Sequence, residues 1–175
     1  NNLLYRSVQK VYSLPFEDNV NGGIPITFLN VPIEYLKDAA IKQLKDGESV
    51  WFGNDVLKEM DRKTGYLDTE LYKTDELFDV DTYMTKAERL ATGEGEVSHA
   101  MTLVGVDLDK GEIRKWKVEN SWSEKSGRKG YFTMSDKWFD EFVYEVVVRK
   151  EFLTDDQKKL AESKPTPLPA WDSLA

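Results

Sequence analysis

The chain has 175 residues, the length of one compact domain, and 40% of them are hydrophobic, so we expect a folded chain with a real core. Acidic residues outnumber basic ones by 32 to 24, and the resulting net charge of −8 makes nucleic acid a poor partner. The chain has no cysteine and one histidine, so disulfides, thiolate metal sites and a His-rich zinc site are excluded within it, and no metal or other cofactor is expected. No apolar run approaches the ~20 residues that span a bilayer, so no membrane contact is expected.

The first 30 residues predict extended structure. Residues 5–20 alternate loosely between apolar and polar side chains, which indicates a strand or an extended arm. The Asn-Gly-Gly run at 21–23 is a strong turn signal. Residues 24–29 then predict a short strand, and Pro25 places this strand at a sheet edge because proline cannot donate a ladder hydrogen bond.

The clearest helix is predicted over residues 33–44, where apolar side chains recur every three or four positions. We expect Asn30 to cap this helix, Pro32 to lie in its first turn and Gly47 to end it. The apolar run 49–53 follows and indicates a buried strand. Two side chains of this run are expected in the core, namely Trp51 and Phe52.

Residues 54–98 are polar and carry only scattered apolar side chains. They predict short helices and loops, with a helix near residues 84–91. A stretch of this length without strong periodicity is typical of a functional segment that leaves the folded scaffold and returns to it, and we call residues 54–98 the excursion.

From His99 onward the sequence is rich in strands. We expect strands at 100–106, 113–119, 131–134 and 143–149, a hairpin turn at 107–111, a loop at 123–130, and helical segments at 136–142 and 154–163. The whole chain therefore predicts one domain of the α+β class, an antiparallel β structure with peripheral helices.

The single histidine lies at the start of one predicted strand, and Asn120 lies at the end of the next. If the two strands form a hairpin, His99 and Asn120 are neighbours. An imidazole that acts as acid and base needs its tautomer and orientation fixed by another group. The Asn120 amide oxygen can accept from one ring nitrogen and leave the other for a nucleophile, and Trp122 could cover this hydrogen bond and exclude water.

These motifs and their flanks resemble one family of enzymes. The segments concerned are Ser98-His99-Ala100-Met101, Val118-Glu119-Asn120-Ser121-Trp122, Gly130-Tyr131-Phe132, Leu29-Asn30-Val31-Pro32, Val50-Trp51-Phe52-Gly53, Lys86-Ala87-Glu88-Arg89 and Trp171-Asp172-Ser173-Leu174-Ala175. Together they resemble papain-like cysteine peptidases, and more narrowly the bleomycin hydrolase and aminopeptidase C family. The resemblance implies a papain-like fold, of which this chain is the antiparallel, β-barrel-like half.

By this resemblance the protein is a cytoplasmic cysteine aminopeptidase that hydrolyses peptides from the N-terminus. His99 is the catalytic acid and base, Asn120 orients it and Trp122 shields the pair. The nucleophilic cysteine and the oxyanion-hole glutamine belong to a missing N-terminal half, because 98 residues precede His99 and papain has roughly 130–150 between cysteine and histidine. Residues 1–164 are then the C-terminal part of the peptidase domain, and we expect the chain alone to be inactive.

The resemblance carries three further expectations. The tail 165–175 enters the active-site cleft, where the terminal carboxylate of Ala175 binds the amine of the peptide substrate. The complete protein forms a homo-oligomer, a hexamer in this family. Ser123 replaces a glycine that usually follows the tryptophan, and this costs of order 1 kcal/mol if the position needs a positive φ.

Each of these interpretations has a plainer alternative. His99 could be a structural residue, Asn120 could cap a turn, Trp122 could belong to the core, and the proline-rich tail could be a frayed end. The alternative for the whole chain is a non-catalytic, β-rich binding or assembly module.

Overall fold

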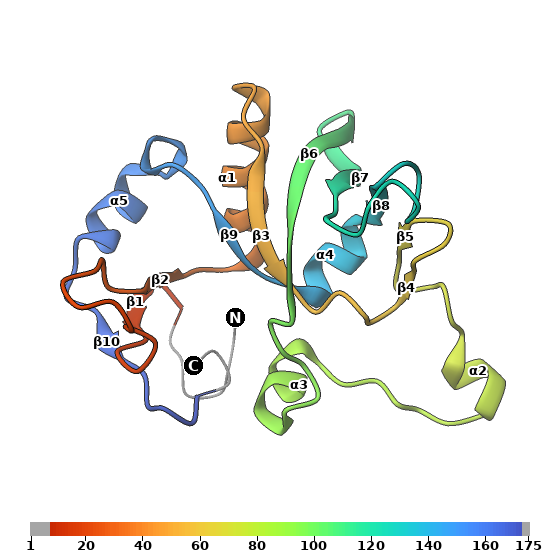
Figure 1. Cartoon of the computed structure of the whole chain (residues 1–175), viewed down its shortest axis with the longest axis horizontal. Coiled ribbons are helices and arrows are strands. Elements are labelled where there is room, and N and C mark those ends of the chain that lie inside the picture. Colours follow the sequence, from red (N-terminus) through yellow and green to blue (C-terminus); the bar gives the residue numbers. More distant parts are fainter. Residues whose placement is uncertain (1–7, 173–175) are drawn as a thin grey trace.

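Two β-sheets organise the chain in the computed structural model, which describes residues 8–172 (Figure 1). The larger sheet has the strand order β4-β5-β8-β7-β6-β3-β9 and the smaller one the order β10-β1-β2. The strands are β1 (Lys10–Ser13), β2 (Thr27–Asn30), β3 (Val50–Asn54), β4 (Met60–Asp61), β5 (Tyr66–Leu67), β6 (His99–Asp109), β7 (Glu112–Glu119), β8 (Tyr131–Ser135), β9 (Val143–Val147) and β10 (Thr166–Pro167). The helices are α1 (Ile33–Lys45), α2 (Thr74–Phe78), α3 (Lys86–Thr92), α4 (Asp136–Phe142) and α5 (Asp155–Ala161), with a 3₁₀ turn, η1, at Lys150–Phe152. The predicted α+β class is confirmed.

The antiparallel hairpin of β6 and β7 is the centre of the larger sheet. Its turn is Lys110-Gly111, and both residues have positive φ, 53° and 92°. A two-residue turn of this kind matches the right-handed twist of the flanking strands. The predicted turn at 107–111 is therefore too long, because β6 continues to Asp109.

The larger sheet curls around α4. Helix α4 packs against β7 and β8, and it also packs against β9, which lies three strands beyond β7 in the sheet order. One helix can contact strands so far apart in the sheet because the sheet is curled. Helix α1 packs on β3, β6 and β9. The core between these elements holds large, fully buried side chains, namely Trp116, Trp138, Phe52, Phe132 and Phe139.

Helix α1 begins at Ile33, as the periodicity predicts, but its cap is different from the expected one. Pro32 is the N-cap and makes no side-chain hydrogen bond to the helix, while Asn30 is the last residue of β2. Gly47 follows the helix with a φ of 90°, which agrees with its expected role as the end of the helix.

The structure corrects two further predictions from the sequence. Trp51 is 44% exposed, whereas its neighbour Phe52 is fully buried as expected. The excursion 54–98 contains α2 and α3, but also the short strands β4 and β5, which carry the sheet onward from β8.

The proline-rich tail packs on the smaller sheet. Strand β10 pairs in parallel with β1, and Leu168 is buried against Tyr12 and Leu14. Residues 166–168 are therefore held in place by backbone pairing and by a small apolar cluster. Within residues 8–172, no helix is long and apolar enough to cross a membrane.

Candidate active site

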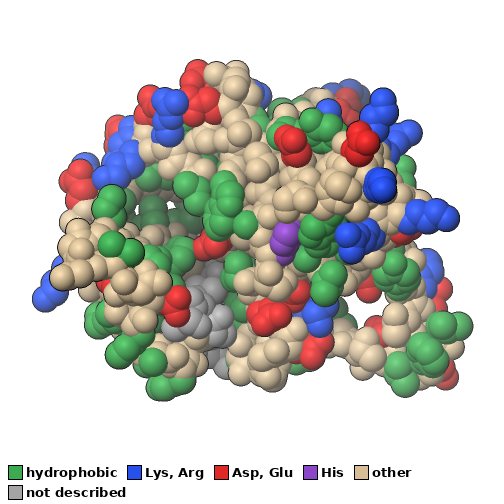
Figure 2. Space-filling model, viewed as in Figure 1, with side chains coloured by type: hydrophobic (Ala, Val, Ile, Leu, Met, Phe, Trp, Pro, Cys, Tyr) green, Lys and Arg blue, Asp and Glu red, His purple; other side chains and the backbone are tan. Residues whose placement is uncertain are grey.

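His99 lies at the open end of the central hairpin, where β6 is flanked by β3 and β7. Its backbone partner on β3 is Asn54, whose side-chain amide donates to the His99 carbonyl at 3.2 Å. The Asn54 carbonyl in turn accepts from the Ser98 amide at 3.1 Å. The backbone on both sides of the histidine is thus fixed by β3, and Figure 2 shows the histidine (purple) reaching the surface.

The His99 ring contacts Asn120, as the hairpin pairing predicts. Nε2 of His99 lies 2.9 Å from Oδ1 of Asn120. The same oxygen accepts from the Ser121 amide at 2.8 Å, which identifies it as the oxygen of the Asn120 side chain. Nε2 therefore carries the proton in the neutral ring, and Nδ1 is left as the basic nitrogen.

Trp122 lies beside this pair. Its ring centroid is 5.0 Å from that of His99, and the Trp122 ring makes an edge-to-face contact with the Phe132 ring. Asn120 is buried, 8% exposed, so little water reaches the hydrogen bond to the histidine. A hydrogen bond shielded in this way is stronger than one in water, which favours a fixed orientation of the ring.

The loop after Trp122 is held by Arg62 and Ser126. The Arg62 guanidinium lies 4.7 Å from the Trp122 ring centroid, and its Nε donates to the Ser126 hydroxyl at 3.3 Å. That hydroxyl donates to the Trp122 carbonyl at 3.0 Å. Ser123, at the position where the resembled family has glycine, has a φ of 68° and so adopts the left-handed conformation.

Sequence reasoning missed the second polar layer of the site, Asn54 and Asp55. Both residues are buried, and the Ser98 hydroxyl donates to the Asp55 carboxylate at 3.4 Å. Burial raises the pKa of Asp55 above the usual range. The feature of the sequence that could have indicated these two residues is that Asn54-Asp55 directly follows the apolar run 49–53.

The Lys86-Ala87-Glu88-Arg89 segment anchors α3 to the end of α4. Lys86 Nζ donates to the carbonyl of Asp140 at 2.9 Å and to that of Val143, and Arg89 donates to the carbonyl and the carboxylate of Glu141. Cations at the C-terminal end of a helix satisfy its free carbonyls and oppose its dipole. Burial of the Lys86 ammonium lowers its pKa to about 7.

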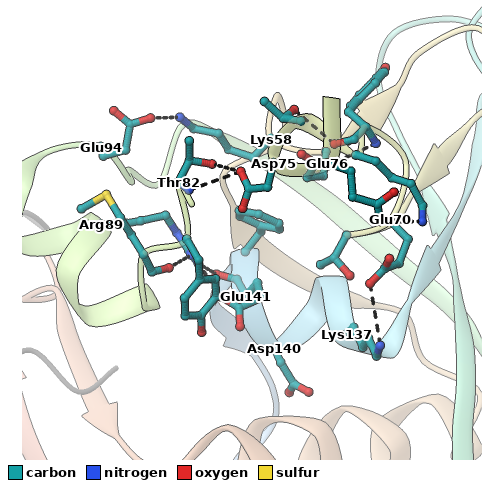
Figure 3. Close-up of a pocket in the computed structure, with 18 residues that line it drawn as sticks. Lys58, Glu70, Asp75, Glu76, Thr82, Arg89, Glu94, Lys137, Asp140 and Glu141 are labelled. Carbon is teal, nitrogen blue, oxygen red and sulfur yellow. Dashed lines mark hydrogen bonds and ion pairs between the residues drawn. The ribbon is translucent and has the colours of Figure 1, made fainter. Parts of the chain in front are cut away.

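A cavity of about 830 Å³ lies between the excursion 54–98 and α4 (Figure 3). His99, Asn120 and Trp122 do not line it. Most of its charged side chains form ion pairs with one another, and these pairs are Lys58 with Glu94, Lys73 with Glu76, Arg89 with Glu141 and Lys137 with Glu70. Charges paired in this way leave few groups to bind a ligand. Across residues 8–172, no group of three or more His, Cys, Asp or Glu side chains could hold a metal ion.

Ala175, the predicted binder of the substrate amine, lies outside the described residues. The part of the tail that the structure describes reaches Asp172, which is buried.

Comparisons with known proteins agree over almost the whole chain. The sequence profile of the Peptidase C1-like family matches residues 4–175. Aminopeptidase G of Lactobacillus delbrueckii subsp. lactis is 69% identical over 95% of this chain and 38% of its own length. Aminopeptidase C of Lactobacillus helveticus is 48% identical over 94% of this chain and 37% of its own length.

The crystal structure of PepW from Lactobacillus rhamnosis HN001 (DR20) superposes with a TM-score of 0.94 at 51% identity, and the match covers 97% of this chain and 39% of that one. The chain thus spans less than two fifths of the length of the relatives it matches. It belongs to the Peptidase C1-like family, in agreement with the papain-like aminopeptidase C family that its motifs resemble.

Proposed function

We propose that the complete protein is a cysteine-type aminopeptidase, and that this chain supplies the acid–base half of its active site. The observation that carries the proposal is the His99–Asn120 pair, in which Nε2 is bound and Nδ1 is left basic. The names of the relatives support the same class of enzyme. The nucleophilic cysteine and the oxyanion-hole glutamine would come from a part of the protein outside these 175 residues, because the chain has no cysteine.

In the proposed reaction, Nδ1 of His99 takes the proton of the cysteine thiol, which gives a thiolate and an imidazolium. The thiolate sulfur attacks the scissile carbonyl carbon, and the C–N bond breaks as Nδ1–H transfers its proton to the leaving amine. A water molecule then gives a proton to Nδ1 and attacks the thioester, which releases the acid and the thiolate. Asn120 keeps the ring in one orientation through both steps.

We also propose that the tail gives the enzyme its aminopeptidase character. The Ala175 carboxylate would bind the substrate amine, and the tail would block the cleft for longer chains. The packing of Leu168 against Tyr12 and Leu14 of the smaller-sheet lobe supports a docked course for residues 166–168 of the tail. By the same resemblance we propose that the complete protein is a homo-oligomer, a hexamer.

The test compares complete protein, wild type and His99→Ala, with this chain alone. We expect the wild type to release an aminocoumarin reporter from amino-acid amides, and a thiol-alkylating reagent to abolish that activity. His99→Ala and the isolated chain should be inactive. A variant at a distant exposed residue, Glu112→Gln, is the control and should keep full activity.

Activity that survives both alkylation and His99→Ala would overturn the proposal. A complete protein that is folded yet hydrolyses no peptide would favour the alternative, a non-catalytic binding or assembly module.

A further inference from the structure

The β4–β5 hairpin of the excursion lies against the loop that follows Trp122. The connection between its two strands runs from Arg62 to Gly65. The Gly127 amide donates to the Arg62 carbonyl at 2.9 Å, and the Thr133 amide donates to the Gly65 carbonyl at 2.7 Å. Backbone hydrogen bonds therefore join this connection both to the loop that carries Trp122 and to β8.

Two glycines let the hairpin and the loop come into close contact. A Cβ added at Gly65 would lie 2.8 Å from the Cα of Gly127, and one added at Gly127 would lie 2.5 Å from the carbonyl oxygen of Tyr131. Real Cβ atoms essentially never come so close to other atoms. The backbone of Arg62 is thus held at a fixed place beside the loop.

The Asp61 carboxylate orders the connection itself. It accepts from the Lys63 amide at 2.8 Å and from the Thr64 hydroxyl at 2.6 Å. Aspartate at the start of a turn stabilises it in this way by accepting hydrogen bonds from the residues that follow. Arg62 lies between Asp61 and these two residues, so its side chain leaves from an ordered turn.

The Arg62 side chain contacts Trp122 in two ways. Its guanidinium carbon lies 4.7 Å from the Trp122 ring centroid, within the range of a cation–π contact. Its Nε donates to the hydroxyl of Ser126, which is buried, and that hydroxyl donates to the Trp122 carbonyl. Arg62 therefore holds both the ring of Trp122 and, through Ser126, its backbone.

Trp122 needs such support because the loop after it has little apolar packing. From 123 to 129, the one buried residue is Ser126. The Trp122 ring lies 5.0 Å from the ring of His99, beside the hydrogen bond between His99 and Asn120. A ring that moved away would admit water to this hydrogen bond and weaken it.

We propose that Arg62 is a positioning residue of the active site, which holds Trp122 against the His99–Asn120 pair without contacting the substrate. The inference rests on the proposed peptidase function of the same site. Both proton transfers of the proposed reaction use His99, so a less well fixed imidazole should lower kcat whichever transfer is slower.

The test measures kcat and KM of the complete protein on a leucine aminocoumarin amide, for wild type, Arg62→Ala and Arg62→Lys. Lys63→Ala is the matched control, because it removes an exposed cation from the same turn, and it should behave like the wild type. Arg62→Ala loses the cation–π contact and the hydrogen bond to Ser126, and its kcat should fall about fivefold with KM unchanged. Arg62→Lys keeps the charge but has neither a planar group nor an Nε donor, so its kcat should stay about threefold below that of the wild type.

Three results would overturn the proposal. An unchanged kcat in Arg62→Ala, even with a lower Tm, would mean that Arg62 serves the fold alone. A changed KM would mean that Arg62 contacts the substrate directly. Full recovery of kcat in Arg62→Lys would mean that the positive charge acts by itself, without the stacked geometry.

If the wild type hydrolyses no peptide, the proposed peptidase function fails, and hydrogen–deuterium exchange then tests the hold of Arg62 on Trp122. The amides of Ser121 and Ser126 flank Trp122 and are hydrogen-bonded, to the Asn120 side chain and to the Ser123 carbonyl. Arg62→Ala should speed exchange at least threefold in peptides that contain these amides, while Lys63→Ala leaves it unchanged. Equal exchange in all three proteins would show that Arg62 does not hold the loop and would overturn the inference.

Discussion

Replacing Ser123 by glycine should stabilise the protein. Ser123 has a φ of 68°, a left-handed conformation that costs a residue with a side chain about 1–2 kcal/mol. Glycine removes this cost but adds about 0.5–1 kcal/mol of unfolded-state entropy. The side chain accepts one exposed 3.4 Å hydrogen bond from Lys125, which contributes little. The net gain in unfolding free energy is about 0.5–1 kcal/mol.

Thermal unfolding measures this gain, which corresponds to a rise of about 1–4 °C in Tm for a chain of this size. The matched control is Ser49→Gly, because Ser49 does not have a positive φ. It should lose about 0.5–1 kcal/mol from the same entropy term. The difference between the two variants then isolates the conformational cost at Ser123. If Ser123→Gly is no more stable than Ser49→Gly, the left-handed conformation is not strained and the reasoning is wrong.

Three further predictions concern Asn120, Lys86 and Leu168. Asn120→Ala should lower kcat/KM of the complete enzyme about 10²-fold, because a misplaced catalytic group costs about that much in rate. The circular dichroism spectrum should stay unchanged. A kcat/KM close to that of the wild type would contradict the orienting role of Asn120. Lys86 has a native pKa of about 7 against 10.5 when unfolded, so the unfolded state binds more protons between these values. The unfolding free energy of the wild type, measured with urea and compared with that of Lys86→Met, should therefore rise by about 1 kcal/mol per pH unit between pH 7 and 9. A difference between the two proteins that does not depend on pH would contradict the lowered pKa of Lys86. Leu168→Ala should remove about 2–3 kcal/mol of packing free energy between the tail and the smaller sheet. Proteinase K should then release the tail faster, as followed by mass spectrometry. An unchanged rate of cleavage would mean that the buried leucine does not hold the tail.

Local patterns were enough to predict the elements that bring the site together. Helix α1 follows from a single helical repeat, and the β6–β7 hairpin follows from two apolar runs on either side of a glycine. Because both strands of that hairpin are close in sequence, the contact between His99 and Asn120 also follows. The catalytic roles of these residues remain predictions.

Contacts between distant segments could not be predicted in this way. Asn54 meets His99 through pairing of β3 with β6, and β10 meets β1 from the opposite end of the chain. Strands β4 and β5 have two residues each, too few to show a period. Trp51 is exposed because it lies on the face of β3 opposite the buried Val50 and Phe52, and an apolar run alone does not distinguish the two faces of a strand.

The two ends of the central β6–β7 hairpin should differ in how well they tolerate a change in chain length. Strand β6 has 11 residues, so the Lys110-Gly111 turn lies about 35 Å along the strand from His99. A reporter peptide grafted into that turn would leave the imidazole where it is. One residue inserted between His99 and Leu103 would instead rotate the histidine to the other face of the sheet, because side chains alternate along a strand. The Lys110-Gly111 turn is therefore the natural site for a tag. The segment of β6 between His99 and Leu103 is where the insertion or deletion of a single residue would be least tolerated.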